Sequence, residues 1–243
     1  MIIAHYKLND NAATDTIIDE TGNHNGAVKD AGGTATSAFH STANSRGVGT
    51  CLDFEGTDDH IEIADHADFS PVLTPFSISA WVYMHTATYF VWASKWQVGS
   101  NREWNIYTGT PKKINFRMYD NSENASIGRL YNTSLASYEG KWTHFVATYD
   151  GGILSSGIKI YLNGNRVDDA DSESGNFISV ENLTAPVYIG RYDTKYADGL
   201  IDNVIIFNQE LNLDEVKALY NGGHGTEIVA VIDIDRRIQR RSI

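Results

Sequence analysis

A carboxylate in the middle of an apolar strand is the residue of this sequence best placed to do chemistry. Asp202 lies among branched aliphatic residues in the stretch 198–208. At the two-residue period of a strand, Asp202 shares one face with Leu200, Val204 and Ile206, and the opposite face is also largely apolar. An ionised carboxylate in such surroundings costs several kcal/mol unless it is compensated. We therefore expect Asp202 to have a partner. That partner is an arginine, a ring of backbone amides or a hard cation such as calcium.

Aromatic residues are the second feature that could bind a ligand, at 11% of the chain with five Trp and thirteen Tyr. A sugar-binding surface uses exposed rings, because the C–H face of a pyranose packs on a ring while nearby polar groups bind its hydroxyls. An aromatic residue in a sandwich strand more often serves packing, so we expect the binding rings in loops. Rings free to line a surface include Trp92, Tyr107 and Tyr131. The preferred ligand contacts are Trp96, Arg102, Tyr192 and Tyr196.

Signatures of catalysis are missing from the sequence. It contains no Gly-x-Ser-x-Gly nucleophile turn, no His-Glu-x-x-His helix and no P-loop. Seven histidines are scattered without the spacing of metal ligands and predict no zinc site. They are His5, His24, His40, His60, His66, His85 and His224. We expect a protein that is not an enzyme.

Length and composition predict one large domain with a short tail. The 243 residues carry a net charge of −12, which disfavours nucleic acid and anionic membranes as partners. No apolar run approaches the roughly 20 residues of a membrane helix. The first residues lack the basic region and apolar core of a secretory signal, so localisation is open, with an extracellular or virion surface suspected. Cys51 is the only cysteine and excludes an internal disulfide.

The apolar pattern predicts many short strands separated by turns. Strands are predicted at 2–8, 51–54, 60–63, 76–84, 89–95, 104–108, 113–119, 141–149, 158–162, 186–191 and within 198–208. Residues 29–49 and 168–182 are predicted loops. A capping pattern at Asn212 and Glu215, with Gly222 after the last turn, predicts one short C-terminal helix. The expected fold is all-β, a two-sheet antiparallel β-sandwich of the jelly-roll type.

The C-terminus differs in composition from the rest. Residues 227–243 include a possible last strand at 228–234, and four of the last eight residues are Arg. We therefore predict a domain at 1–226 and a basic tail at 227–243. The tail is either solvated or an attachment peptide, in which Ile238 and Ile243 would be apolar anchors on an acidic partner.

Several short motifs, in order, resemble the laminin-G-like jelly roll of the concanavalin A-like lectin and glucanase superfamily. They are Tyr6-x-Leu8, Asp19-x-Thr21-Gly22-Asn23-x-Asn25-Gly26, Leu52-x-Phe54-x-Gly56-x-Asp58-Asp59, Pro75-Phe76-Ser77-Ile78-Ser79-Ala80-Trp81-Val82, Trp142-x-His144-x-Val146-x-Thr148-Tyr149-Asp150-Gly151, Tyr161-x-Asn163-Gly164, Gly199-x-Ile201-Asp202-x-Val204 and Leu211-x-x-Asp214-Glu215-Val216. The resemblance covers about residues 4–223.

The resemblance implies a structural calcium ion held by Asp202, with Asp58, Asp19 and Asn25 as further candidate ligands. It also bears on catalysis, because superfamily members that cleave β-glucans carry a Glu-x-Asp-x-x-Glu strand. This chain has no such run. His144 matches the Trp-x-His motif, in which a structural role is expected.

Three functions follow as hypotheses. The first is a calcium-stabilised, non-catalytic binding or adhesion module that recognises a glycan or a cell or protein surface through its loops. The alternative is a structural component of an assembly, such as a phage or virus head decoration or tail protein, anchored by the Arg-rich tail. A glycan-cleaving enzyme is the third. Binding on a glycan array, the effect of deleting 227–243 and the release of sugar ends from polysaccharides would separate them.

Overall fold

The computed structural model of the chain describes residues 1–10, 14–30, 40–41, 49–99 and 101–226. The predicted strand at 228–234 and the basic tail at 227–243 lie outside these residues. No helix in the described residues is long and apolar enough to cross a membrane.

The strands are short and connected by tight turns, as the apolar pattern predicts. They are β1 (Ile2–Tyr6), β2 (Thr16–Ile17), β3 (Gly26–Lys29), β4 (His40–Ser41), β5 (Cys51–Glu55), β6 (His60–Ile63), β7 (Phe76–Met84), β8 (Val91–Gln97), β9 (Asn101–Thr108), β10 (Ile114–Asp120), β11 (Ala125–Tyr131), β12 (Trp142–Tyr149), β13 (Ile158–Leu162), β14 (Asn165–Arg166), β15 (Ala170–Asp171), β16 (Val187–Ile189), β17 (Arg191–Tyr192), β18 (Lys195–Tyr196) and β19 (Asp198–Phe207). The helices are α1 (Leu213–Tyr220) and the short 3₁₀ turns η2 (Ala67–Phe69), η3 (Leu135–Tyr138), η4 (Ser155–Gly157) and η5 (Asn221–Gly223).

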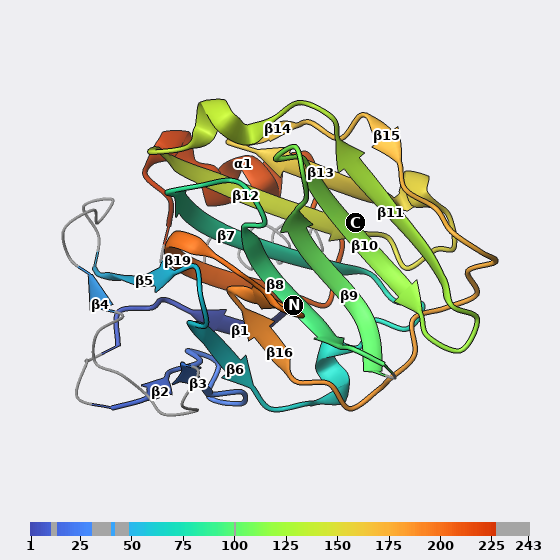
Figure 1. The fold of residues 1–243 in the computed structure, drawn as a ribbon, viewed down its shortest axis with the longest axis horizontal. Helices are drawn as coiled ribbons and strands as arrows, with labels where there is room; N and C mark the ends of the chain where they lie inside the picture. The colour runs from blue at the N-terminus through green and yellow to red at the C-terminus, as the bar shows by residue number, and fades with distance from the viewer. Residues whose placement is uncertain (11–13, 31–39, 42–48, 100, 227–243) are drawn as a thin grey trace, which may run out of the picture.

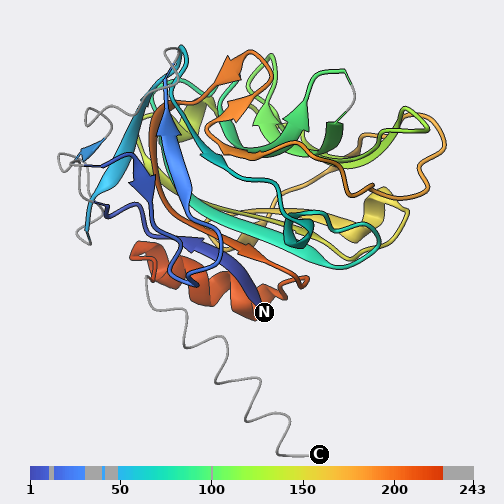
Figure 2. The same cartoon turned by 90° about the horizontal axis from the view of Figure 1, so that it is seen from below.

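Two antiparallel sheets form the body of the molecule, and this confirms the predicted β-sandwich (Figure 1). The eight-stranded sheet has the order β14-β13-β12-β7-β19-β5-β4, with β1 also paired to β19. The nine-stranded sheet has the order β15-β11-β10-β9-β8-β16-β6-β3-β2. Helix α1 and the small hairpin β17–β18 lie on opposite sides of the sandwich (Figure 2). The first covers the eight-stranded sheet, and the second contacts β8 of the nine-stranded sheet.

Helix α1 is capped as predicted. The Asn212 side chain accepts hydrogen bonds from the backbone amides of Asp214 and Glu215, and the Glu215 carboxylate accepts one from the Asn212 amide. The helix ends at Tyr220, and Asn221 adopts the left-handed conformation with φ 47°. Its apolar face packs over β19 in a small second core that includes Phe207, Val216 and Leu219.

The main core lies between the sheets, and the expected role of Trp92 is wrong. We expected that ring to be free to line a surface, but it is 1% exposed and packs between Phe90 and Phe145. Register shifts in the β8–β9 pair, one between Val91 and Ala93, change which side chains face inward. Tyr131 also packs against this core.

A bulge in β19 changes the predicted faces of the stretch 198–208. The pairing with β7 shifts between Asp202 and Ile205, and Asn203 adopts φ 51°. Ile201 and Val204 therefore both face the core between the sheets. The expectation that Asp202 and Val204 share a face is wrong, because the inserted residue breaks the two-residue period.

Candidate functional site

The outer face of the nine-stranded sheet carries polar and aromatic side chains on its central strands. In β9 and β10, Trp104, Ile106, Phe116 and Met118 face the core. The intervening residues face outward, as the two-residue period requires. They are Asn105, Tyr107, Asn115, Arg117 and Tyr119.

A bulge in β9 adds Arg102 to this face. Lys95 pairs with Trp104 and the next residue of β8, Trp96, pairs with Arg102, so Glu103 is the inserted residue. The buried carboxylate of Glu103 instead lies 2.6 Å from the buried ammonium group of Lys95. The bulge thus turns Arg102 toward the same side as Trp96 while Glu103 is withdrawn into an ion pair.

Five of these side chains form one group, here named the aromatic–arginine cluster. Its members are Trp96, Arg102, Tyr107, Tyr119 and Tyr192. Ring centroids are 5.0 Å apart for Trp96 and Tyr119, 5.2 Å for Trp96 and Tyr192, and 4.7 Å for Tyr107 and Tyr192. The Arg102 guanidinium lies 4.4 Å from the Tyr119 centroid and its Nε donates to Asn121 Oδ1.

The members of the cluster differ in how much of each side chain is exposed to solvent. Trp96 and Tyr119 are each 7% exposed, whereas Tyr107, Tyr192 and Arg102 are half-buried. Trp96 therefore supports the cluster more than it offers a free ring. Burial, together with the neighbouring Tyr107, raises the pKa of Tyr192 to about 12 although Arg117 opposes the shift. The Tyr192 hydroxyl therefore stays protonated at neutral pH and can donate a hydrogen bond.

Next to the cluster lies a row of polar side chains that lack partners. Asn105 is fully buried, and neither its Oδ1 nor its Nδ2 has a hydrogen-bond partner among the described residues. The same holds for Asn115 Oδ1 and Arg117 Nε. Asn105 pairs in register with Arg117, and Asn115 pairs with Tyr107. A buried polar atom without a partner costs about 1–3 kcal/mol. These atoms have no accessible surface, so the parts of this face that a ligand can touch are the half-buried side chains of Tyr107, Arg117 and Tyr192.

The structure brings together three of the four predicted ligand contacts. Trp96, Arg102 and Tyr192 lie in the aromatic–arginine cluster. Tyr196, on the other strand of the hairpin, belongs to a neighbouring group in which Arg191 lies 5.8 Å from its ring centroid and 4.8 Å from that of Tyr188. Sequence reasoning passed over Asn105, Asn115 and Arg117, although their alternation with core residues was the signal that could have found them.

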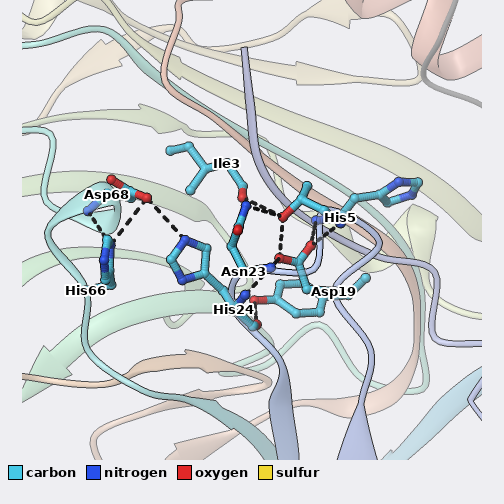
Figure 3. A network of polar contacts seen from close by, with 9 residues as sticks. Ile3, His5, Asp19, Asn23, His24, His66 and Asp68 are labelled. Atoms are coloured by element: carbon cyan, nitrogen blue, oxygen red, sulfur yellow. Dashed lines mark hydrogen bonds and ion pairs between the residues drawn. The ribbon is translucent and has the colours of Figure 1, made fainter.

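The predicted calcium ligand Asp19 is occupied by hydrogen bonds (Figure 3). Its two oxygens accept from the backbone amides of His5, Thr21, Asn23 and His24 and from the Thr21 hydroxyl. These donors hold the pKa of Asp19 below its usual range, although burial acts in the opposite direction. A ring of backbone amides, one of the partners considered for Asp202, is found here instead.

The remaining predicted calcium ligands lie in different places. Asn25 Oδ1 accepts from the Asp19 amide. Asp58 lies in the β5–β6 turn with Glu55 and Asp59, and their carboxylate oxygens are within 4.8 Å of one another. Asp202 is fully buried and pairs in register with Trp81.

These positions give no single oxygen shell that contains all four predicted ligands. Calcium prefers six to eight oxygen ligands. The oxygens of Asp19 and Asn25 are committed to amide donors, so these two side chains fit a structural role better than metal ligation. Calcium binding stays a prediction for Asp58 and for Asp202, and the three carboxylates of the β5–β6 turn are the closest match to its chemistry.

One histidine group forms that the sequence spacing did not predict. His24 Nε2 and His66 Nδ1 lie 3.1 Å and 3.3 Å from Asp68 Oδ2 (Figure 3). The His66 Nδ1 atom also accepts a hydrogen bond from the Asp68 amide as the cap of η2. Its lone pair is therefore used in the turn, and the group is explained by capping.

Comparison with known proteins agrees with this architecture. A family model described as the concanavalin A-like lectin/glucanases superfamily, Laminin_G_3, matches residues 55–217. No curated protein matches the sequence. Among solved structures, domain 4 of AbnA, an extracellular arabinanase from Geobacillus stearothermophilus determined with arabinotriose, superposes with a TM-score of 0.63. It is 19% identical, and the match covers 89% of this chain and 96% of that domain.

Two toxin structures are similar over part of their length. The binding domain of Paraclostridial Mosquitocidal Protein 1 gives a TM-score of 0.61 at 16% identity, and covers 91% of this chain and 52% of that one. The ligand-binding domain of botulinum neurotoxin serotype D, in complex with N-acetylneuraminic acid, gives 0.62 at 17% identity, with 91% and 50% covered. At such identities the likeness concerns the fold alone. Because the family model matches most of the chain and the sandwich is the one expected, the chain belongs to the laminin-G-like family, Laminin_G_3, of the concanavalin A-like lectin/glucanases superfamily.

Proposed function

We propose that this protein is a non-catalytic glycan-binding module that uses the outer face of its nine-stranded sheet. The observation that carries the proposal is the aromatic–arginine cluster, in which the half-buried rings of Tyr107 and Tyr192 lie 4.7 Å apart and the guanidinium of Arg102 is also half-buried. Partly exposed rings beside a few polar groups are typical of ligand sites.

The chemistry of this face suits a saccharide. Half-buried rings of Tyr107 and Tyr192 offer surfaces for the C–H face of a sugar, and the half-buried guanidinium groups of Arg102 and Arg117 can bind its hydroxyls. The arabinanase domain whose structure contains arabinotriose supports this choice by analogy. An extracellular location is proposed with it.

The arrangement of acids supports binding rather than cleavage. Glycosidases that retain configuration need two carboxyl groups about 5–5.5 Å apart, and inverting ones need about 6.5–9.5 Å. The outward-facing residues described in β9 and β10 include no Asp or Glu, and Glu103 is withdrawn toward Lys95. The described outward residues of β9 and β10 therefore offer no pair of acids for either mechanism.

Two further expectations stay proposals. Calcium stabilisation through Asp58 or Asp202 would be tested by the melting temperature with added calcium and with chelator. The role in a phage or virus assembly depended on the tail at 227–243, and no contact among the described residues favours it over glycan binding.

The test is calorimetric titration of the protein with arabinan, xylan, galactan, polyuronate and sialylated oligosaccharides. We expect one class to bind, and Tyr192→Ala to weaken that binding by about tenfold or more, because a stacked ring contributes about 1–3 kcal/mol. Tyr83→Ala is the matched control, since Tyr83 is a half-buried tyrosine on the eight-stranded sheet. No binding across the panel, or equal losses in both variants, would refute the proposal.

A further inference from the structure

The cations of the outer face are not neutralised by the protein. Arg102, Arg117, Arg191 and Lys195 have no carboxylate within ion-pair distance among the described residues. The chain as a whole carries 31 acidic and 19 basic residues, so acidic partners are not scarce. By contrast Arg129 and Arg166, at the far edge of the sandwich, both pair with Asp168. Of the described arginines, the three without a carboxylate partner, Arg102, Arg117 and Arg191, all lie on or beside this face. Lysines without one, such as Lys29, Lys141 and Lys217, are spread over other parts of the described chain.

Arg117 is the most centrally placed of them. It stands on β10, opposite Asn105 of β9 on one side and Gly128 of β11 on the other. Its guanidinium has no hydrogen-bond or ion-pair partner in the described residues, and its Nε is buried. Gly128 is confined to glycine, because a Cβ there would lie 2.6 Å from the Phe116 carbonyl oxygen and 3.4 Å from that of Ser172. Arg117 itself is half-buried, so part of its side chain is exposed on the outer face.

The electrostatic consequence decides between neutral and anionic ligands. A sugar that covered Arg117 would remove water from a guanidinium that has no protein partner. For a neutral ligand this is a desolvation cost without a compensating charge. For a carboxylate it is a charge-assisted pair, because the planar fork of the guanidinium fits two carboxylate oxygens.

We infer that the ligand of this face is an acidic saccharide, a uronic or sialic acid unit, with its carboxylate on Arg117. The sugar ring lies against the half-buried rings of Tyr107 and Tyr192. Arg102, Arg191 and Lys195 extend the positive potential beyond Arg117, so a longer polyanionic saccharide meets several cations. This inference rests on the proposed glycan binding and specifies its ligand class.

The test compares an oligouronide with its carboxyl-reduced, neutral counterpart by calorimetric titration of the full chain. We expect the acidic form to bind about tenfold or more tightly, and its affinity to fall as salt is raised from 50 to 200 mM while that of the neutral form does not. Arg117→Met should bring the acidic form to the affinity of the neutral form. Arg117→Lys, which keeps the charge but loses the fork, should fall between them.

Controls separate this inference from the function on which it rests. Lys217→Met removes a cation from α1 on the other side of the molecule and should change neither affinity. Thermal melts must show that the Arg117 variants fold. If both saccharides bind equally and Arg117→Met affects them alike, the acidic-ligand inference is overturned and glycan binding stands. If neither the uronide, its reduced form nor any member of the wider panel binds, the proposed function itself is overturned.

Discussion

Asn105 is fully buried on β9 between Ser94 of β8 and Arg117 of β10, and its amide makes no hydrogen bond with the described residues. Such a side chain weakens the folded state, since water has been removed and nothing has replaced it. The amide has no accessible surface, so a ligand on the outer face does not touch it. Its unpaired atoms therefore bear on stability rather than on binding.

Replacement of Asn105 by Leu should remove this cost. The two side chains have the same branching and similar volume, so Asn105→Leu should raise the free energy of unfolding by about 1 kcal/mol. Glycan binding should persist, because no polar atom of Asn105 is exposed. Urea denaturation and titration with the bound saccharide measure the two effects, and a destabilised variant would contradict this account.

At the scale of elements, Asp168 joins the two sheets at one edge of the sandwich. Its fully buried carboxylate accepts from Arg129 of β11 in the nine-stranded sheet and from Arg166 of β14 in the eight-stranded sheet. It also accepts from the Ile160 amide of β13. Burial acts to raise the pKa of Asp168, but the bonds from Arg166 and Ile160 outweigh it and hold the pKa below the ordinary value of 3.8.

Asp168→Asn should lower the free energy of unfolding by about 1–3 kcal/mol at pH 7, because a buried charged acceptor is lost while Arg166 is 45% exposed and Arg129 keeps its pair with Asp171. The sign of the pH dependence follows from the lowered pKa. The stabilisation is present above the unfolded pKa of 3.8 and is lost as pH falls through the still lower folded pKa. The difference between the unfolding free energies of the two proteins should therefore be similar at pH 7 and 5 and smaller at pH 3. A constant difference across that range would contradict this account.

The β19 bulge also acts at this scale. Asn203 accepts a positive φ that β-branched residues avoid, and its side chain contacts His5 Nε2 at 2.7 Å and donates to the Thr226 carbonyl. One residue thus ties the first strand, the central strand and the end of the described chain. This contact is also the reason why the apolar faces of β19 change at Asp202.

At the scale of the whole molecule, the chain segments from both ends of the described domain meet on β19. Strand β1 pairs with β19, and Thr226 is bonded to Asn203 of the same strand. Helix α1 then covers the outer side of β19 with its own small core. The described domain therefore contains the packing partners of its central strand.

We predict that a chain ending at residue 226 folds as one cooperative unit. Its melting temperature should stay within about 3 °C of that of the full chain, since a loss below 1 kcal/mol shifts the midpoint of a domain of this size by only about 2–4 °C. Calorimetry of the two chains is the measurement. Loss of the cooperative transition would show that residues 227–243 belong to the sandwich, against the predicted boundary.

Much of the fold could be predicted from local patterns. The two-residue period of β7 and the capping pattern at Asn212 predicted those elements because burial and backbone capping act over a few residues. Strand β11 was missed, since Gly128 and Arg129 interrupt its apolar pattern. The bulges at Glu103 and Asn203 were missed as well, because an inserted residue is defined by its partner strand.

The sequence by itself determined the fold class, the family and the residue types that a glycan site would use. Trp96, Arg102 and Tyr192 could be chosen from it because aromatic and cationic side chains have that chemistry wherever they lie. Only the tertiary structure decided that these three meet, that Tyr196 stands in another group, and that Asp19 is bound by amides. It also placed Asn105 and Arg117 side by side without partners, since pairing between strands and the desolvation that follows depend on residues far apart in the chain.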